Sequence, residues 1–173
     1  MAKILTTDRL VLREMVQTDA DDLLSIFEDD EAMRYYPSRK SRDETIDWIH
    51  WTIENYEKYG VGLWIVEDKT SGQFLGQCGL VLQKIKGAVE VEIGYLFARQ
   101  HWGNGYATEA ALACKMYGFQ TLGLKKVISL IDPLNKPSIR VASRIGMSYE
   151  RAIVKRGKAL DLYACYEVGN GRV

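Results

Sequence analysis

The spacing of hydrophobic residues changes along the chain from a strand period to a helix period and back. The run Leu10-Val11-Leu12-Arg13 predicts a first strand. Thr18 then stands where a helix N-cap is expected, because acidic residues follow it and an apolar face repeats at helical spacing. That face comprises Leu23, Leu24 and Phe27. The first part of the chain therefore predicts a strand followed by a helix.

A second helix has clearer boundaries. Ser41 and Glu44 fit a capping box, in which the serine side chain caps the helix and the glutamate reaches back to the serine backbone. Gly60 marks the end, because glycine readily adopts the left-handed conformation of a helix C-terminus. The apolar face between them comprises Ile46, Ile49, Ile53 and Tyr56.

The two-residue period of strands follows. Residues 63–67, 74–82 and 89–98 predict three strands, and the short polar turns between them indicate an antiparallel meander. The helical period then returns in a helix with a face of small residues, from Ala107 to Gly118, that ends at Gly123. The remaining predicted elements are a strand at residues 127–131, a short helix from Pro137 to Gly146, and a hairpin of residues 149–154 and 159–168. The order βααβββαβαββ predicts an α+β fold with a mostly antiparallel central sheet.

The chain has 173 residues, the size of one domain, and we expect a single domain over residues 1–173. Lys and Arg total 23, as do Asp and Glu, so the formal net charge is +0. This balance argues against a general nucleic-acid or membrane-surface binder, which carries a basic excess. No apolar run approaches the roughly 20 residues that span a bilayer, and the N-terminus has no apolar core of signal-peptide length. We therefore expect a cytoplasmic protein.

Cysteine and histidine are scarce. Cys78, Cys114 and Cys165 form no Cys-x-x-Cys pair, which argues against a disulfide framework and against a zinc site. His50 and His101 are the two histidines, so a histidine-based metal site is not expected either. We expect free thiols and no metal.

One segment, between a predicted strand and a predicted helix, carries candidate chemistry. Gly103 and Gly105 allow the backbone to approach a ligand, and free N–H groups at the start of the helix then bind a phosphate without a basic side chain. Two glycines alone are more typical of an ordinary turn. The loop lacks the Gly-Lys-Ser/Thr of a Walker A motif and the third glycine of a dinucleotide fingerprint, although an alanine can replace the latter.

Segments spread over the chain carry a more specific pattern. They are Thr7-Asp8-Arg9-Leu10-Val11-Leu12-Arg13, Glu92-Ile93-Gly94-Tyr95, Trp102-Gly103-Asn104-Gly105-Tyr106-Ala107-Thr108-Glu109-Ala110, Asn135-Lys136-Pro137-Ser138-Ile139-Arg140-Val141-Ala142 and Arg144-Ile145-Gly146-Met147. In this order they resemble the GNAT superfamily of acetyl-CoA-dependent N-acetyltransferases, and within it the RimJ- and RimL-type ribosomal-protein N-terminal acetyltransferases. The resemblance implies the GNAT fold, with splayed central strands.

The resemblance also implies a site for the cosubstrate acetyl-CoA. The pantetheine arm is expected to pair with the backbone of Tyr95, Leu96 and Phe97. The N–H groups that are expected to hold the pyrophosphate belong to Gly103, Asn104, Gly105, Tyr106, Ala107 and Thr108. Asn135 matches the family's asparagine near the pantetheine, although by itself it is typical of a turn.

The implied reaction is direct attack of a primary amine on the thioester. Such an amine is mostly protonated at neutral pH, since its pKa is about 8 at a chain terminus and about 10.4 in lysine, so a base must accept a proton. We nominate Glu92, which alternatively faces solvent or pairs with an arginine; Glu90 has the same facing. The N–H of Phe97 is expected to stabilise the oxyanion. Ser138 is expected to protonate the departing thiolate, to cap a helix, or both.

Some positions depart from the family pattern. Ala142 stands where related enzymes have a tyrosine acid, and Leu130 stands where some have a glutamate base. An alternative is therefore a non-catalytic acyl-CoA-binding or regulatory domain. Lys136, Arg140 or Arg144 either meets the 3′-phosphate of coenzyme A or is merely solvated.

The acceptor is expected to be a protein N-terminus, ribosomal or other, or a small-molecule amine, with the chain a monomer or a homodimer. Aromatic residues cluster in the part of the chain where family members bind the acceptor. They are Tyr35, Tyr36, Trp48, Trp51 and Trp64. Core packing explains such residues more often than ligand stacking, and an aromatic-lined groove is the alternative.

Overall fold

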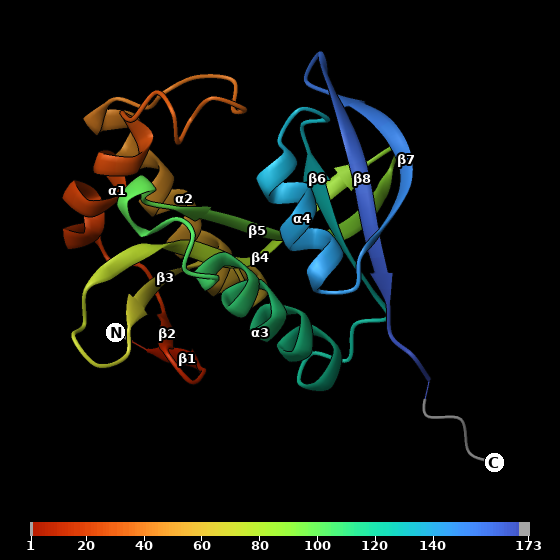
Figure 1. Ribbon diagram of the computed structural model, residues 1–173, viewed down its shortest axis with the longest axis horizontal. Coiled ribbons are helices and arrows are strands. Elements are labelled where there is room, and N and C mark those ends of the chain that lie inside the picture. The colour runs from red at the N-terminus through yellow and green to blue at the C-terminus, as the bar shows by residue number, and fades with distance from the viewer. Residues whose placement is uncertain (1, 170–173) are drawn as a thin grey trace.

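The computed structural model describes residues 2–169, which form an eight-stranded sheet flanked by four α-helices (Figure 1). The strands are β1 (Lys3–Thr6), β2 (Leu10–Arg13), β3 (Leu63–Asp68), β4 (Phe74–Ile85), β5 (Ala88–Phe97), β6 (Lys126–Ile131), β7 (Ser148–Lys155) and β8 (Lys158–Tyr166). The helices are α1 (Ala20–Phe27), α2 (Arg42–Tyr59), α3 (Tyr106–Gln120) and α4 (Lys136–Arg144), with 3-10 helices η1 (Gln17–Asp19) and η2 (Arg99–His101). The strand order is β1-β2-β3-β4-β5-β6-β8-β7, and β5 and β6 run parallel. This confirms the predicted α+β fold with a mostly antiparallel sheet.

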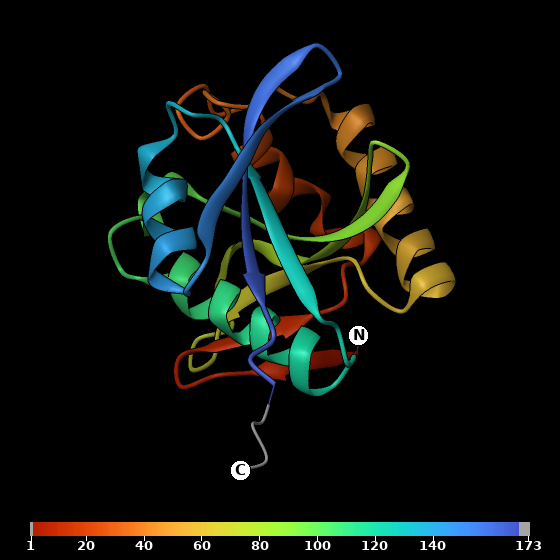
Figure 2. The ribbon, with the colours of Figure 1, turned by 90° about the vertical axis from the view of Figure 1, so that its right-hand side faces the viewer.

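The helices cover both faces of the sheet (Figures 1 and 2). Successive residues of a strand face opposite sides, so Trp64 packs in the core under α3 and α4, whereas Ile65 packs under α1 and α2. On α3, Ala110, Ala111 and Cys114 are completely buried, as the small-residue face predicts. Among residues 2–169, no helix is long and apolar enough to cross a membrane.

Two features near the N-terminus differ from the sequence prediction. The pattern does not predict β1, a short strand of mixed polarity that pairs with β2 alone. Thr18 caps no helix, because residues 17–19 form a 3-10 turn and α1 begins at Ala20. The carboxylate of Asp19 accepts instead from the N–H of Val16 at 2.8 Å and from the buried guanidinium of Arg13 at 2.8 and 2.9 Å. A buried arginine requires a carboxylate partner, and this pairing sets the chain path.

The predicted ends of α2 are confirmed. Ser41 Oγ accepts from the N–H of Glu44 at 3.2 Å, and Gly60 has the left-handed φ of 72°. Within residues 2–169, the backbone N–H of Ser41 does not donate to the side chain of Glu44 in return. Only half of the predicted capping box therefore forms.

The sheet opens at its centre, between β5 and β6. The register pairs Glu92 with Ile128, and no further pair of these strands is in register within the described residues. Figure 2 shows β6 and β8 at a steep angle to β3, β4 and β5. The structure therefore has the predicted splayed central strands.

Candidate active site

Polar side chains join β5 to β6 where the strands separate. Ser129 Oγ donates to the carbonyl of Ile93 at 2.9 Å, and the N–H of Leu130 donates to Glu92 Oε2 at 3.0 Å. Each bond connects a side chain of one strand to a backbone group of the other. Side chains thus replace the ladder bonds that a continuous sheet would have, and the strands are free to diverge beyond them.

Beyond these two hydrogen bonds, β5 directs the backbone groups of alternate residues into the gap between β5 and β6. The N–H of Ala98 donates to β4 at 2.9 Å, and the direction of hydrogen bonding alternates along an antiparallel strand. Tyr95 and Phe97 therefore direct their N–H and C=O groups away from β4, where Trp102 Nε1 donates to the carbonyl of Phe97 at 2.9 Å. By the same alternation, the backbone of Leu96 faces β4. Of the three residues predicted to pair with pantetheine, Tyr95 and Phe97 present backbone groups to the gap.

The glycine loop between η2 and α3 exposes a row of N–H groups. Gly103 and Gly105 have φ of 80° and 78°, a left-handed conformation that strains other residues, and Gly105 is the N-cap of α3. Within residues 2–169, no backbone N–H from Gly103 to Thr108 donates a hydrogen bond. A Cβ on Gly103 would meet no atom within 4 Å, so space lies beside the loop. The loop is therefore open and suited to an anion.

The turn between β1 and β2 contacts the glycine loop and the first turn of α3. Glu109, in the first turn of α3, accepts from Thr7 Oγ1 at 2.6 Å and from the backbone N–H and Nε of Arg9 at 3.0 and 2.7 Å. Arg9 also donates to the carbonyl of Asn104 at 2.9 Å and lies over the ring of Tyr106. Burial alone would raise the pKa of Glu109, but the bonds from Thr7 and Arg9 hold it below its usual range. The sequence analysis quoted Thr7 and Arg9 within a motif but assigned them no role.

Glu109→Gln is expected to weaken binding of coenzyme A about tenfold, as measured by calorimetry. The amide group cannot accept from both donors of Arg9, and a charge-assisted hydrogen bond contributes about 1.5 kcal/mol. Glu54→Gln, on the exposed side of α2, is the control and is expected to bind normally. Unchanged affinity in a folded Glu109→Gln protein would show that the turn between β1 and β2 does not position the loop.

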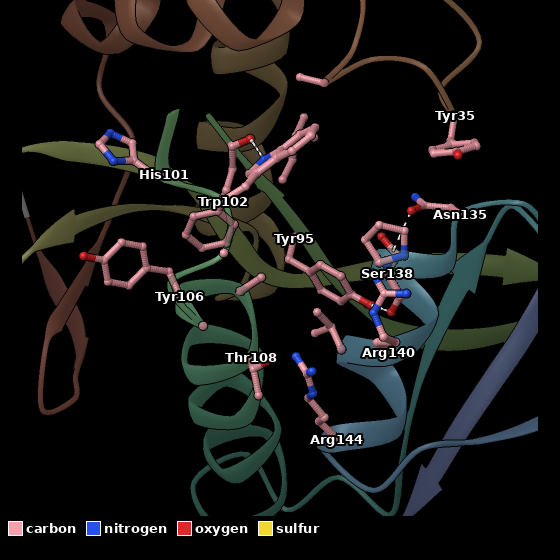
Figure 3. Close-up of a pocket in the computed structure, with 18 of the residues that line it drawn as sticks. Tyr35, Tyr95, His101, Trp102, Tyr106, Thr108, Asn135, Ser138, Arg140 and Arg144 are labelled. Atoms are coloured by element: carbon pink, nitrogen blue, oxygen red, sulfur yellow. Dashed lines mark hydrogen bonds between the residues drawn. The ribbon is translucent and has the colours of Figure 1, made fainter. Parts of the chain in front are cut away.

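Helix α4 forms the opposite wall of the gap (Figure 3). Asn135 Oδ1 accepts from the N–H of Ser138 at 3.3 Å, so Asn135 is the N-cap of α4 and the predicted capping role of Ser138 is wrong. Tyr95 Oη donates to the carbonyl of Ser138 at 2.8 Å and so bridges β5 and α4. Ser138 Oγ has no hydrogen-bond partner in the described part of the chain.

Two arginines of α4 face the glycine loop. Figure 3 shows Arg140 and Arg144 extending toward the cleft opposite Thr108, and both line it. Neither forms an ion pair with any residue from 2 to 169. Lys136 instead donates to the carbonyl of Pro133 at 3.1 Å and does not line the cleft. Of the three basic residues considered for a phosphate, Arg140 and Arg144 line the cleft and Lys136 does not.

Two clefts meet at the gap. One, of about 580 Å³, lies between the glycine loop and α4. The other, of about 810 Å³, lies between the loop that precedes α2 and the turn of the β7–β8 hairpin. The residues that line both are Tyr35, Tyr36, Tyr95, Leu96, Asn135 and Ser138. We call the first the cofactor cleft and the second the acceptor cleft, after the roles that are proposed for them under Proposed function. A group held in one can thus reach a group held in the other.

Glu92 lies in the acceptor cleft, beside the point where the clefts join. It is partly buried and pairs with no arginine among residues 2–169; its carboxylate accepts from Gln83 Nε2 at 2.9 Å as well as from the N–H of Leu130. Burial raises the pKa of Glu92, and the bonds from Leu130 and Gln83 and the charge of Lys155 oppose that shift. Glu90, by contrast, forms an ion pair with Lys126 at 3.2 Å and does not line the cleft.

The aromatic cluster divides between core and cleft. Trp64 is buried against Tyr117, which fits the packing interpretation. Trp48 and Trp51 line the acceptor cleft, where their rings lie 5.1 Å apart. Tyr36 lines both clefts. The sequence suggested Tyr36 only as part of a cluster.

Comparison with known proteins identifies the family. A model of the acetyltransferase (GNAT) domain matches residues 9–148. The chain belongs to the GNAT acetyltransferase family. It is 50% identical to the uncharacterized protein YkkB of Bacillus subtilis over 160 residues, covering 92% of this chain and 93% of that one. It is 34% identical to the uncharacterized N-acetyltransferase YoaA of the same species, covering 87% and 85%.

GNAT membership fits the architecture described above. The ribosomal L7/L12 alpha-N-protein acetyltransferase RimL, solved with coenzyme A, is 16% identical and superposes with a TM-score of 0.79, covering 95% of this chain and 98% of that one. At this identity the likeness concerns the fold alone. The family match, rather than this superposition, identifies the chain as an N-acetyltransferase. Acetyl transfer from acetyl-CoA is the activity of that family.

Proposed function

We propose that this GNAT enzyme transfers an acetyl group from acetyl-CoA to a primary amine by direct attack on the thioester. The observation that carries the proposal is the row of partnerless N–H groups from Gly103 to Thr108, which opens onto a cleft that continues into a second one. These N–H groups bind the pyrophosphate. Arg140 or Arg144, both in the cofactor cleft, binds the 3′-phosphate.

The rest of the cofactor cleft fits the pantetheine arm. Tyr95 and Phe97 provide the backbone groups that pair with it, and Asn135 lies at the edge where both clefts meet. Acetyl-CoA, when bound, supplies the reactive thioester. The N–H of Phe97 faces the gap and stabilises negative charge on the carbonyl oxygen.

The amine enters through the acceptor cleft. Glu92 accepts its proton, directly or through water, because its raised pKa makes it a stronger base than a solvated carboxylate. Ser138 Oγ, which has no hydrogen-bond partner among residues 2–169, donates a proton to the departing thiolate. The whole chain acts as one catalytic domain, and the acceptor is a small-molecule amine or the N-terminus of a protein.

A thiol-release assay tests this function. Purified protein is incubated with acetyl-CoA and a panel of amines: amino acids, amino sugars, polyamines and peptides with free N-termini. We expect at least one amine to accelerate release of free coenzyme A, with the acetylated amine detected by mass spectrometry. Binding of acetyl-CoA without acceleration by any amine would favour a non-catalytic acyl-CoA-binding domain instead.

A further inference from the structure

The acceptor cleft carries an excess of basic side chains. Its charged lining residues are Lys40, Glu92, Asp132, Lys155, Arg156 and Lys158. The whole chain is neutral, so the excess is local. The charge of the cleft bears on what can bind beside the amine.

Both carboxylates of the cleft already have partners. Glu92 accepts from Gln83 and from the N–H of Leu130. Asp132 forms an ion pair with Lys158 at 3.2 Å, and Lys158 also donates to the carbonyl of Tyr35. One basic residue is therefore neutralised within the cleft, and three others are not.

The three remaining basic residues have no carboxylate partner among residues 2–169. Lys40 lies over the rings of Trp48 and Phe27, with its ammonium group 5.0 and 5.7 Å from their centres. Lys155 donates to Gln83 Oε1, which is a neutral group. Arg156, exposed in the β7–β8 turn, forms no ion pair at all within that range.

This positive charge lies close to the proposed base. Lys155 and Glu92 bind opposite ends of one side-chain amide, that of Gln83. An amine placed at Glu92 would therefore have the ammonium group of Lys155 on the far side of the Gln83 amide, with Arg156 and Lys40 in the same cleft. Like charges repel there, and an anion attached to the same molecule is attracted.

We propose that the acceptor amine also carries an acidic group, a carboxylate or a phosphate, held by Lys155 and Arg156, with Lys40 adding to the positive potential. This inference rests on the proposed function, because it assumes that the amine lies at Glu92. It disfavours polyamines, which bring further positive charge into the cleft.

The experiment compares amines of similar length that differ in charge. The probes are 4-aminobutyrate, 3-aminopropylphosphonate, 4-aminobutanamide and 1,4-diaminobutane, and the same charge series is built on whichever amine of the broader panel reacts fastest. We expect kcat/KM for the acids to exceed that for the neutral amide at least about tenfold, with the diamine lowest, and the advantage to shrink as salt is raised. The preference between carboxylate and phosphonate identifies the acidic group.

Arg156→Gln is expected to raise KM for the acids about tenfold and to leave kcat/KM for the neutral amide unchanged. Arg151→Gln, on the same hairpin but outside the cleft and paired with Glu150, is the control and is expected to change neither. Equal rates across the charge series, or a preference for the diamine, would overturn the inference while the acetyltransferase function stands. No turnover with any amine would overturn both.

Discussion

Gly105→Val will weaken binding of acetyl-CoA about 1,000-fold, the largest effect that we expect from a single substitution. Gly105 has a φ of 78°, which a β-branched residue does not adopt without strain, so the chain must rotate at the N-cap of α3. That rotation turns several N–H groups away from the pyrophosphate. Two or three hydrogen bonds to a charged group, at about 1.5–3 kcal/mol each, amount to this loss.

Gly87→Val is the matched control for this prediction. Gly87 has a φ of 81° in the turn between β4 and β5, and a Cβ there would meet no atom within 4 Å. The substitution therefore brings similar strain at a place remote from the loop. We expect normal binding of acetyl-CoA by calorimetry. Unchanged affinity in a folded Gly105→Val protein would refute the assignment of the loop.

Glu92→Gln will lower kcat about 100-fold and leave the Kd of acetyl-CoA within about twofold of its original value. Glutamine matches the shape of the carboxylate and can still accept from Leu130, but it cannot take a proton, and general base catalysis contributes about 10²–10⁴-fold. Steady-state kinetics and calorimetry provide the two measurements. Glu90→Gln, on the same strand and paired with Lys126, is the control and is expected to have nearly normal kcat.

The pH dependence of Glu92→Gln provides an independent test. In the unsubstituted enzyme, kcat is expected to rise with pH through the pKa of Glu92, which burial places above the usual value for a glutamate, because only the ionised form accepts a proton. That rise is expected to be absent in the variant. Normal turnover with an unaltered pH profile would remove Glu92 from the mechanism.

Loss of folding does not explain the expected fall in kcat. A carboxyl group whose pKa is raised on folding stabilises the native state fully below its unfolded-state pKa, and this contribution is lost as the pH rises through the higher folded value. Above the folded-state pKa, ionised Glu92 therefore opposes folding. Chemical denaturation should accordingly show that Glu92→Gln is no less stable than the original protein at pH values where Glu92 is ionised.

Sequence reasoning was most successful where the determining contacts are local. The cap at Ser41, the left-handed Gly60 and the glycine loop before α3 each depend on residues a few positions apart. It was least successful at Thr18, because the buried pair of Arg13 and Asp19 overrides the local capping preference. The sequence did not predict the short strand β1 for a related reason. Its own residues have no clear strand pattern, and its pairing with β2 makes it a strand.

The amino-acid sequence by itself determined the order of the elements other than β1, the loop of N–H groups and the family resemblance, because each depends on short segments of neighbouring residues. Only the tertiary structure decided that Glu109 is held by Arg9 and that Glu92 bonds Leu130 across the open sheet. It also decided that basic side chains without a carboxylate partner among residues 2–169 line the same cleft as Glu92. These contacts join residues far apart in the chain. Strand order and register bring them together, and both are fixed by packing over the whole fold rather than by any local pattern.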